Sequence, residues 1–214
     1  MDSSNWMSLL TGFIGVVVGG TIPLVGSLLA KRAERLNELS KLIAEKRLAA
    51  YEEVITTVRF ASIAAGSLEG KQFTKIPVIL CYPERFDTWM IEFVAISRRV
   101  SHLIDADLSY ELWVFQNYLH FLCEHLDKCR DAEGKISNTK TVGAIGEIVY
   151  KDFLQLTSRI IEQASKFFST QIYRSRFEPS TIQKLEGPSV LPRYFAQLAL
   201  ISKKEEILRL INDN

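Results

Sequence analysis

The fold of this chain is decided by the stretch WMSLLTGFIGVVVGGTIPLVGSLLA, which runs from Trp6 to Ala30. It holds no charged residue, and Lys31, Arg32 and Arg35 follow it at once. A helix needs about 20 predominantly apolar residues to cross a bilayer, and this run is somewhat longer. The sequence therefore predicts an uncleaved transmembrane helix, with residues 1–30 as an N-terminal membrane anchor.

Small residues recur along one face of this predicted span. Gly15 and Gly19 form a GxxxG unit, and residues three or four positions apart lie on the same side of a helix. Lipid does not drive helices together, so membrane helices associate where small residues let their backbones approach. We therefore expect a homo-oligomer, although glycine is also simply common in membrane helices. The predicted transmembrane packing residues are Gly12, Gly15, Gly19, Pro23 and Gly26.

The charges that flank the span predict its orientation. Asp2 precedes the span, whereas Lys31, Arg32 and Arg35 follow it. Cytoplasmic segments carry the excess of lysine and arginine. We expect a single-pass protein of the inner (cytoplasmic) membrane, with its N-terminus outside and its C-terminal domain cytoplasmic. The three cations are predicted to lie at the membrane surface, where each contributes about 1 kcal/mol with anionic lipid.

Composition limits what the rest of the chain does. The 214 residues carry a net charge of only +1, so the chain lacks the strong basic field of many nucleic-acid-binding proteins. Cys81, Cys123 and Cys129 have no C-x-x-C spacing and should be reduced thiols in the cytoplasm. Roughly 180 residues remain beyond the anchor, enough for one domain with its own core.

The predicted fold class is all-α, with one N-terminal transmembrane helix that continues into a cytosolic helical bundle. Residues 31–68 lack proline and are rich in strong helix formers. They predict a long juxtamembrane amphipathic helix, whose apolar face includes Leu48, Tyr51 and Val58 and packs on a globular domain. Residues 69–214 predict the cytosolic bundle that packs with it.

Within the bundle, apolar residues recur at helical spacing in four segments. Asp105 to Asp107 is predicted to form a short turn that joins two antiparallel helices. Gly70 to Pro83 is predicted as a loop without a sheet, because its one apolar run has no evident partner strand. The helical segments are approximately residues 84–104, 109–130, 139–176 and 193–211.

Candidate catalytic residues are sparse. The sequence holds no Walker P-loop, no H-E-x-x-H, no G-x-S-x-G and no dinucleotide-binding glycine pattern, and it implies no cofactor. Arg98, Arg99 and His102 resemble the arginine–histidine pair of helical ribonucleases of the HEPN superfamily. Fewer residues separate Arg98 from His102 than in that motif, and Arg99 replaces its polar residue. A solvated face, or a salt bridge to Asp105, is the alternative interpretation.

Two further clusters are candidates for binding. One helix could direct three potential metal ligands toward the same ion, namely His120, Cys123 and Asp127. Free cysteine is also ordinary at the edge of an apolar helical face. The segment SKFFSTQIYRSRF alternates basic and aromatic residues, which is typical of surfaces that stack nucleobases but also of core aromatics beside solvated charges. Its candidate ligand or nucleic-acid contacts are Lys166, Arg174 and Arg176.

The overall plan resembles that of small single-span bacterial membrane proteins of anti-phage systems. The resemblance lies in the glycine-bearing span LLTGFIGVVVGGTIPLVGSLLAKR and the basic helix KLIAEKRLAAYEEV. One such protein is the membrane accessory protein of type VI CRISPR systems, which joins a membrane helix to a HEPN-like helical domain and assembles as a pore. The resemblance implies an assembly-forming membrane effector.

Three hypotheses follow. The first is a non-enzymatic homo-oligomer in the lipid bilayer that permeabilises or remodels the inner membrane in defence. The second is a membrane-tethered HEPN-like ribonuclease that uses Arg98 or Arg99 with His102. The third is a membrane scaffold for a soluble partner. The sequence leaves the cytosolic protein or nucleic-acid partner unidentified and favours the non-enzymatic hypothesis.

Overall fold

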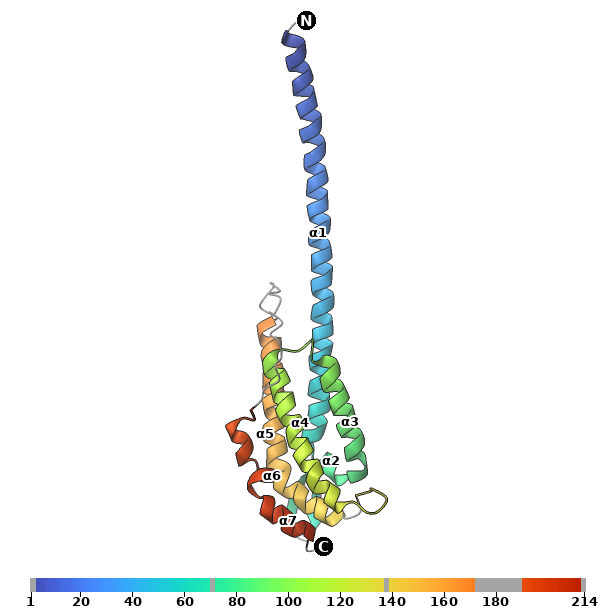
Figure 1. Ribbon diagram of the computed structural model, residues 1–214, viewed down its shortest axis with the longest axis vertical. Helices are drawn as coiled ribbons and strands as arrows, with labels where there is room; N and C mark the ends of the chain where they lie inside the picture. The colour runs from blue at the N-terminus through green and yellow to red at the C-terminus, as the bar shows by residue number, and fades with distance from the viewer. Residues whose placement is uncertain (1–2, 70–71, 137–138, 172–189, 213–214) are drawn as a thin grey trace. The chain divides into compact units, whose positions relative to one another are not determined.

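The computed structural model describes residues 3–69, 72–136, 139–171 and 190–212. Of these, the side chains of residues 3–24, 67–69, 72–74, 83–84 and 169–171 are not described. The described chain is mostly helical, which confirms the predicted all-α character (Figure 1). It divides into two compact units, residues 1–46 and residues 47–214.

Helix α1 runs from Ser3 to Ser62 and passes through the boundary between the two units. Its last part buries a stripe at helical spacing: Ala50, Tyr51, Val54, Val58 and Ala61. Tyr51 and Val58 were predicted on this stripe, but Leu48 was predicted there wrongly and is exposed. Over the residues that the structure describes, no helix combines the length and hydropathy that crossing a membrane requires.

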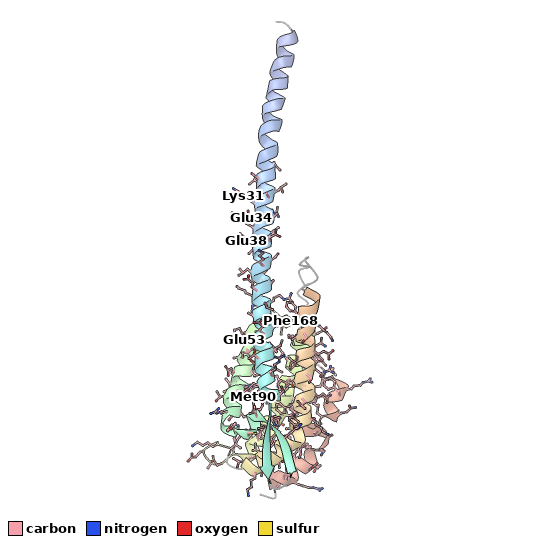
Figure 2. All side chains as sticks on the ribbon, turned by 180° about the vertical axis from the view of Figure 1, so that it is seen from behind. Lys31, Glu34, Glu38, Glu53, Met90 and Phe168 are labelled. Atoms are coloured by element: carbon pink, nitrogen blue, oxygen red, sulfur yellow. The ribbon has the colours of Figure 1, made fainter. Side chains whose placement is uncertain are left out.

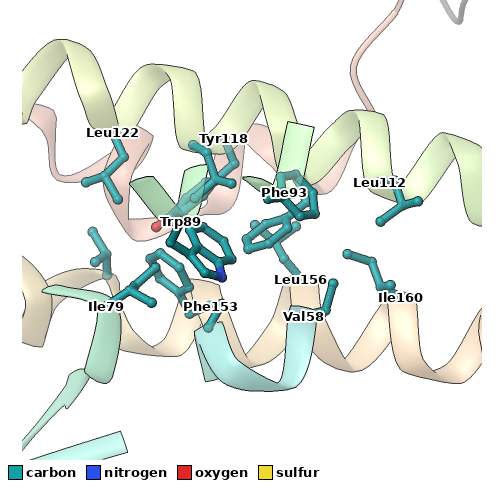
Figure 3. Packing of buried hydrophobic residues seen from close by; sticks show 14 of the residues in the cluster. Val58, Ile79, Trp89, Phe93, Leu112, Tyr118, Leu122, Phe153, Leu156 and Ile160 are labelled. Carbon is teal, nitrogen blue, oxygen red and sulfur yellow. The ribbon is translucent and has the colours of Figure 1, made fainter. Parts of the chain in front are cut away.

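The second unit is built on four neighbouring helices (Figure 1). Helices α3 (Pro83–Val100), α4 (Ala106–Leu126) and α5 (Thr139–Gln171) pack with the last part of α1. Trp89 of α3 stacks on Phe93 with ring centroids 5.5 Å apart, and Phe93 meets Phe115 of α4 edge-on. Figure 3 shows Trp89 among side chains of several elements, including Val58 and Phe153. The predicted apolar seams of these helices are therefore the core of the unit.

The turn between α3 and α4 spans residues 101–105 and so begins earlier than the predicted Asp105–Asp107, because α3 ends at Val100 and α4 begins at Ala106. The Asp105 side chain caps α4 by accepting a hydrogen bond from the Leu108 amide at 2.8 Å. The Tyr51 hydroxyl donates to Asp105 Oδ2 at 2.8 Å and accepts from the Asp105 amide at 3.1 Å. The residue that caps α4, Asp105, is therefore hydrogen-bonded to α1.

A β-hairpin replaces the loop that the sequence predicted after α1. Strand β1 (Ala64–Glu69) pairs antiparallel with β2 (Gln72–Pro77), and the short helix α2 (Val78–Cys81) follows. The long helix was predicted to extend to residue 68, but it ends at Ser62. The prediction was wrong because AAGSLE, the partner strand, has none of the apolar alternation that marks a strand.

The predicted last helix is three short elements: 3-10 helix η2 (Arg193–Gln197), α6 (Ala199–Ser202) and α7 (Lys204–Asn212). Leu198 breaks the run with extended backbone, φ −60° and ψ 143°. Asp152 of α5 accepts hydrogen bonds from the Ala199 and Leu200 amides at 2.8 and 2.9 Å, which begins α6 anew. The single helix predicted over 193–211 was therefore wrong. A shorter 3-10 helix, η1 (Asp127–Cys129), extends α4.

Candidate functional site

The arginine–histidine candidate lies at the C-terminal end of α3. Helix α3 ends at Val100, and Ser101 keeps helical backbone (φ −52°, ψ −31°), so His102 lies in the turn that follows directly. Arg99 forms an ion pair with Glu53 of α1. The alternative salt bridge to Asp105 is also absent among the described contacts, because that carboxylate bonds Tyr51 and the Leu108 amide. Arg98 and His102 are both exposed.

The candidate metal ligands point to different partners. His120 is exposed and lies 3.9 Å from Glu124, whereas Asp127 pairs with Arg130 at 2.7 Å. Cys123 Sγ lies 3.1 Å from Met90 Sδ, and burial raises the pKa of the Cys123 thiol to about 11. Across the described residues there is no group of three or more potential metal ligands.

Only part of the basic and aromatic segment lies within the described residues. Arg174 and Arg176 lie outside them, and Lys166 is exposed and pairs with Glu162 at 3.2 Å. The neighbouring aromatic side chains face the protein. Phe167 stacks on Tyr51 with ring centroids 4.0 Å apart, and Arg47 lies over the same ring at 4.8 Å. Of the two interpretations of these phenylalanines, contact with the bundle is the one the structure bears out.

Only some of the predicted membrane residues have described surroundings. Those of Gly12, Gly15, Gly19 and Pro23 are not described. Gly26 is exposed, and a Cβ added there would meet no atom within 4 Å. Lys31, Arg32 and Arg35 are exposed, and Figure 2 shows Lys31 with Glu34 and Glu38 along this part of α1. Several large apolar side chains of the same segment are also exposed: Val25, Leu28, Leu29, Leu36, Leu39, Leu42 and Ile43.

Sequence reasoning missed a buried ionic cluster that joins three elements. Glu111 of α4 is buried and accepts three hydrogen bonds from the Arg159 guanidinium of α5, the shortest at 2.7 Å. The Tyr194 hydroxyl of η2 donates to Glu111 at 3.0 Å, and Arg159 lies 4.2 Å from the centre of the Tyr194 ring. Hydrogen bonding to Glu111 raises the pKa of Arg159, and burial raises that of Tyr194. The available signal was that Glu111 shares the helical face of the apolar residues Leu108 and Phe115.

Asp152 is a second buried carboxylate that the sequence did not single out. Besides the two amides of α6, it accepts a hydrogen bond from the Tyr118 hydroxyl at 3.2 Å. Burial raises the pKa of Asp152, while these hydrogen bonds lower it. Burial, followed by the charge of Asp152, raises the pKa of Tyr118. These hydrogen bonds hold α6 against α4 and α5.

The structure thus pairs the candidate metal ligands with different partners and gathers other polar residues instead. Glu111 and Asp152 serve the fold, and His125 of α4 lines a pocket beside the C-terminal elements. No protein-family model, curated protein or solved structure matches this chain.

Proposed function

We propose that this chain is a single-pass inner-membrane protein that self-associates through its N-terminal helix and permeabilises or remodels the membrane in bacterial anti-phage defence. The observation that carries the proposal is the uncharged run Trp6–Ala30 with small residues along one face. Helix α1 continues without a break from Ser3 to Ser62, so one element includes this run and the segment that follows it.

The exposed apolar side chains after the run support self-association. Val25, Leu29, Leu36, Leu39 and Ile43 are spaced by three, four or seven residues and so share one helical face. Leu36 and Leu39 are each 56% exposed. Burying such side chains between copies is favourable by about 25 cal/mol per Å² of apolar surface. An anchor that orients every copy alike would make this packing parallel.

The charges that follow the run support the orientation. Lys31, Arg32 and Arg35 are exposed and form no ion pair within the described residues. Free cations beside an apolar run are suited to anionic headgroups on the cytoplasmic side. The bundle would then regulate the assembly from the cytoplasm.

The mass of the full-length protein in mild detergent tests this proposal. We expect several copies in a closed assembly, and leakage of dye from liposomes that contain it. The variant Gly15→Leu with Gly19→Leu should lose both properties. Its control is Phe13→Leu with Val17→Leu, which adds the same two leucines on the opposite face. Intact assembly and leakage in the glycine variant would overturn the proposal.

The same detergent preparation distinguishes the two alternative functions, a membrane scaffold and a ribonuclease. A clean monomer in detergent that co-purifies with a soluble protein would favour a membrane scaffold. Cleavage of RNA that is lost in His102→Ala would favour a ribonuclease. The contacts of Arg99 do not favour the latter, because this guanidinium is engaged by Glu53.

A further inference from the structure

A pocket of about 540 Å³ lies between the C-terminal end of α4 and the elements η2, α6 and α7. Sites for small organic ligands generally measure about 300–1,000 Å³. Its apolar lining includes Phe121 and Phe195, whose ring centroids are 5.9 Å apart, and Leu200. The pocket therefore offers aromatic surface in a volume suited to a small molecule.

His125 is the buried polar side chain of this lining. It is only 6% exposed, and its Nδ1 lies 2.8 Å from the Phe121 carbonyl oxygen. A carbonyl only accepts, so Nδ1 carries the hydrogen and donates, which leaves a lone pair on Nε2. Nε2 has no hydrogen-bond partner within the described chain. A buried polar atom left unpaired is costly, so this nitrogen is matched to a ligand that brings a hydroxyl or N–H donor.

The charged residues of the lining are mostly cations that come from three different elements. Lys128 belongs to η1, Arg193 to η2 and Lys204 to α7, and Glu124 is the carboxylate among the lining residues. Three positive charges and one negative charge give +2 with His125 neutral. Among the described residues, none of these three cations forms an ion pair, whereas Glu124 lies 3.9 Å from His120. The charge of the pocket is thus matched to an anion of about −2, the charge of a phosphate monoester near neutral pH.

We propose that this pocket binds a small phosphate monoester with an aromatic body and a hydroxyl donor, the chemistry of a nucleoside monophosphate. Lys128, Arg193 and Lys204 bind the phosphate by charge-assisted hydrogen bonds. The aromatic body packs on Phe121 and Phe195, and a hydroxyl donates to Nε2 of His125. This site belongs to the second unit and does not depend on how the N-terminal helix assembles.

Titration calorimetry on the full-length protein in mild detergent tests the proposal, with adenosine monophosphate as the probe. Adenosine lacks the phosphate, and inorganic phosphate lacks the aromatic body. We therefore expect each of them to bind about tenfold or more weakly than adenosine monophosphate. Failure of adenosine monophosphate to bind, or equal affinity for adenosine, overturns the proposal.

Two variants locate the binding. Arg193→Ala with Lys204→Ala removes two exposed cations and should weaken binding of adenosine monophosphate about tenfold or more. The control, Lys140→Ala with Lys151→Ala, removes two exposed cations of α5 outside the pocket and should leave the affinity unchanged. Equal affinity in both variants, or equal loss in both, overturns the assignment to this pocket. His125→Phe, checked for folding by circular dichroism, should also weaken binding.

Discussion

The two parts of helix α1 differ in what covers their apolar residues. Within residues 47–62, Val54 is 2% exposed and Val58 is fully buried, whereas Leu36 and Leu39 in residues 25–46 are each 56% exposed. Both parts are rich in strong helix formers, so both are helical for the same local reason. Helix propensity therefore accounts for the secondary structure of α1, but burial requires partners from other elements.

The largest expected effect comes from removing one of those partners in the second unit. Arg159→Ala leaves the buried Glu111 carboxylate without its guanidinium. The Arg159 side chain is 39% exposed and the Tyr194 hydroxyl still donates to Glu111, so the loss should be about 2–3 kcal/mol, less than for a fully buried pair. Urea unfolding of the full-length protein in mild detergent should show a loss of this size.

The matched control for this variant is Lys135→Ala. Lys135 pairs with Glu133 at 2.9 Å, but both side chains are exposed, so the loss should stay below about 1 kcal/mol. Similar losses in the two variants would mean that burial of Glu111 does not strengthen its pair with Arg159.

A smaller loss is expected where the hairpin meets α5. A Cβ added at Gly146 would lie 2.5 Å from Ile76 Cγ2, whereas a Cβ added at Gly143 would lie 3.8 Å from Ile76 Cδ1. Gly146→Ala should therefore cost about 1–3 kcal/mol through overpacking. Gly143→Ala should be neutral or should stabilise by up to about 1 kcal/mol, because alanine favours the helix. Thermal unfolding of the two variants compares them, and equal midpoints would show that Ile76 moves aside freely.

The contact between Ile76 and Gly146 also explains why the hairpin escaped prediction. The apolar seams of α3 and α4 were predicted because residues close together in the sequence show the helical period, as Phe86, Trp89 and Phe93 do. Strand β1 has no such pattern. It pairs with β2, whose Ile76 lies against Gly146 of α5. The break at Leu198 is similar, because the carboxylate that caps α6 is Asp152, far away in the sequence.

The candidate sites depend on distant segments in the same way. Spacing grouped Arg99 with Arg98 and His102, but Arg99 forms an ion pair with Glu53 of α1. Conversely, His125 and Lys204 are brought to one pocket by folding alone, and no spacing in the sequence predicts that. Local periodicity therefore recovers helices and much of the core, while sites that combine distant segments require the structure.

A still smaller effect is expected at Tyr51, the residue by which the buried part of α1 holds the start of α4. Tyr51→Phe removes the hydrogen bonds with Asp105 and should cost about 1 kcal/mol. Burial raises the pKa of Tyr51 from 10.0 to about 12. The folded state then keeps a proton that the unfolded state loses, so this stability is complete below pH 10 and is lost as the pH rises through about 12.

Urea unfolding at pH 8 and at pH 11 checks this pH dependence. The protein should lose more stability than Tyr51→Phe between the two values, since the variant has no hydroxyl to ionise at this site. Tyr118 and Tyr194, whose pKa values are also raised, remain in both proteins and contribute equally. An identical loss in the two proteins would mean that Tyr51 ionises alike in the folded and unfolded states.

The smallest effect on folding is expected in the exposed part of α1. It is measured by comparing Leu39, which is exposed, with the buried Val54. Val54→Ala should cost about 1.5 kcal/mol, because two buried methyl groups are lost. Leu39→Ala removes a larger group from an exposed site and should change the free energy of unfolding by less than about 0.5 kcal/mol. If this face packs between copies, Leu39→Ala should instead lower the mass of the assembly in detergent at low protein concentration, while Val54→Ala leaves it unchanged. An unchanged mass in Leu39→Ala would mean that this exposed face has no role in association.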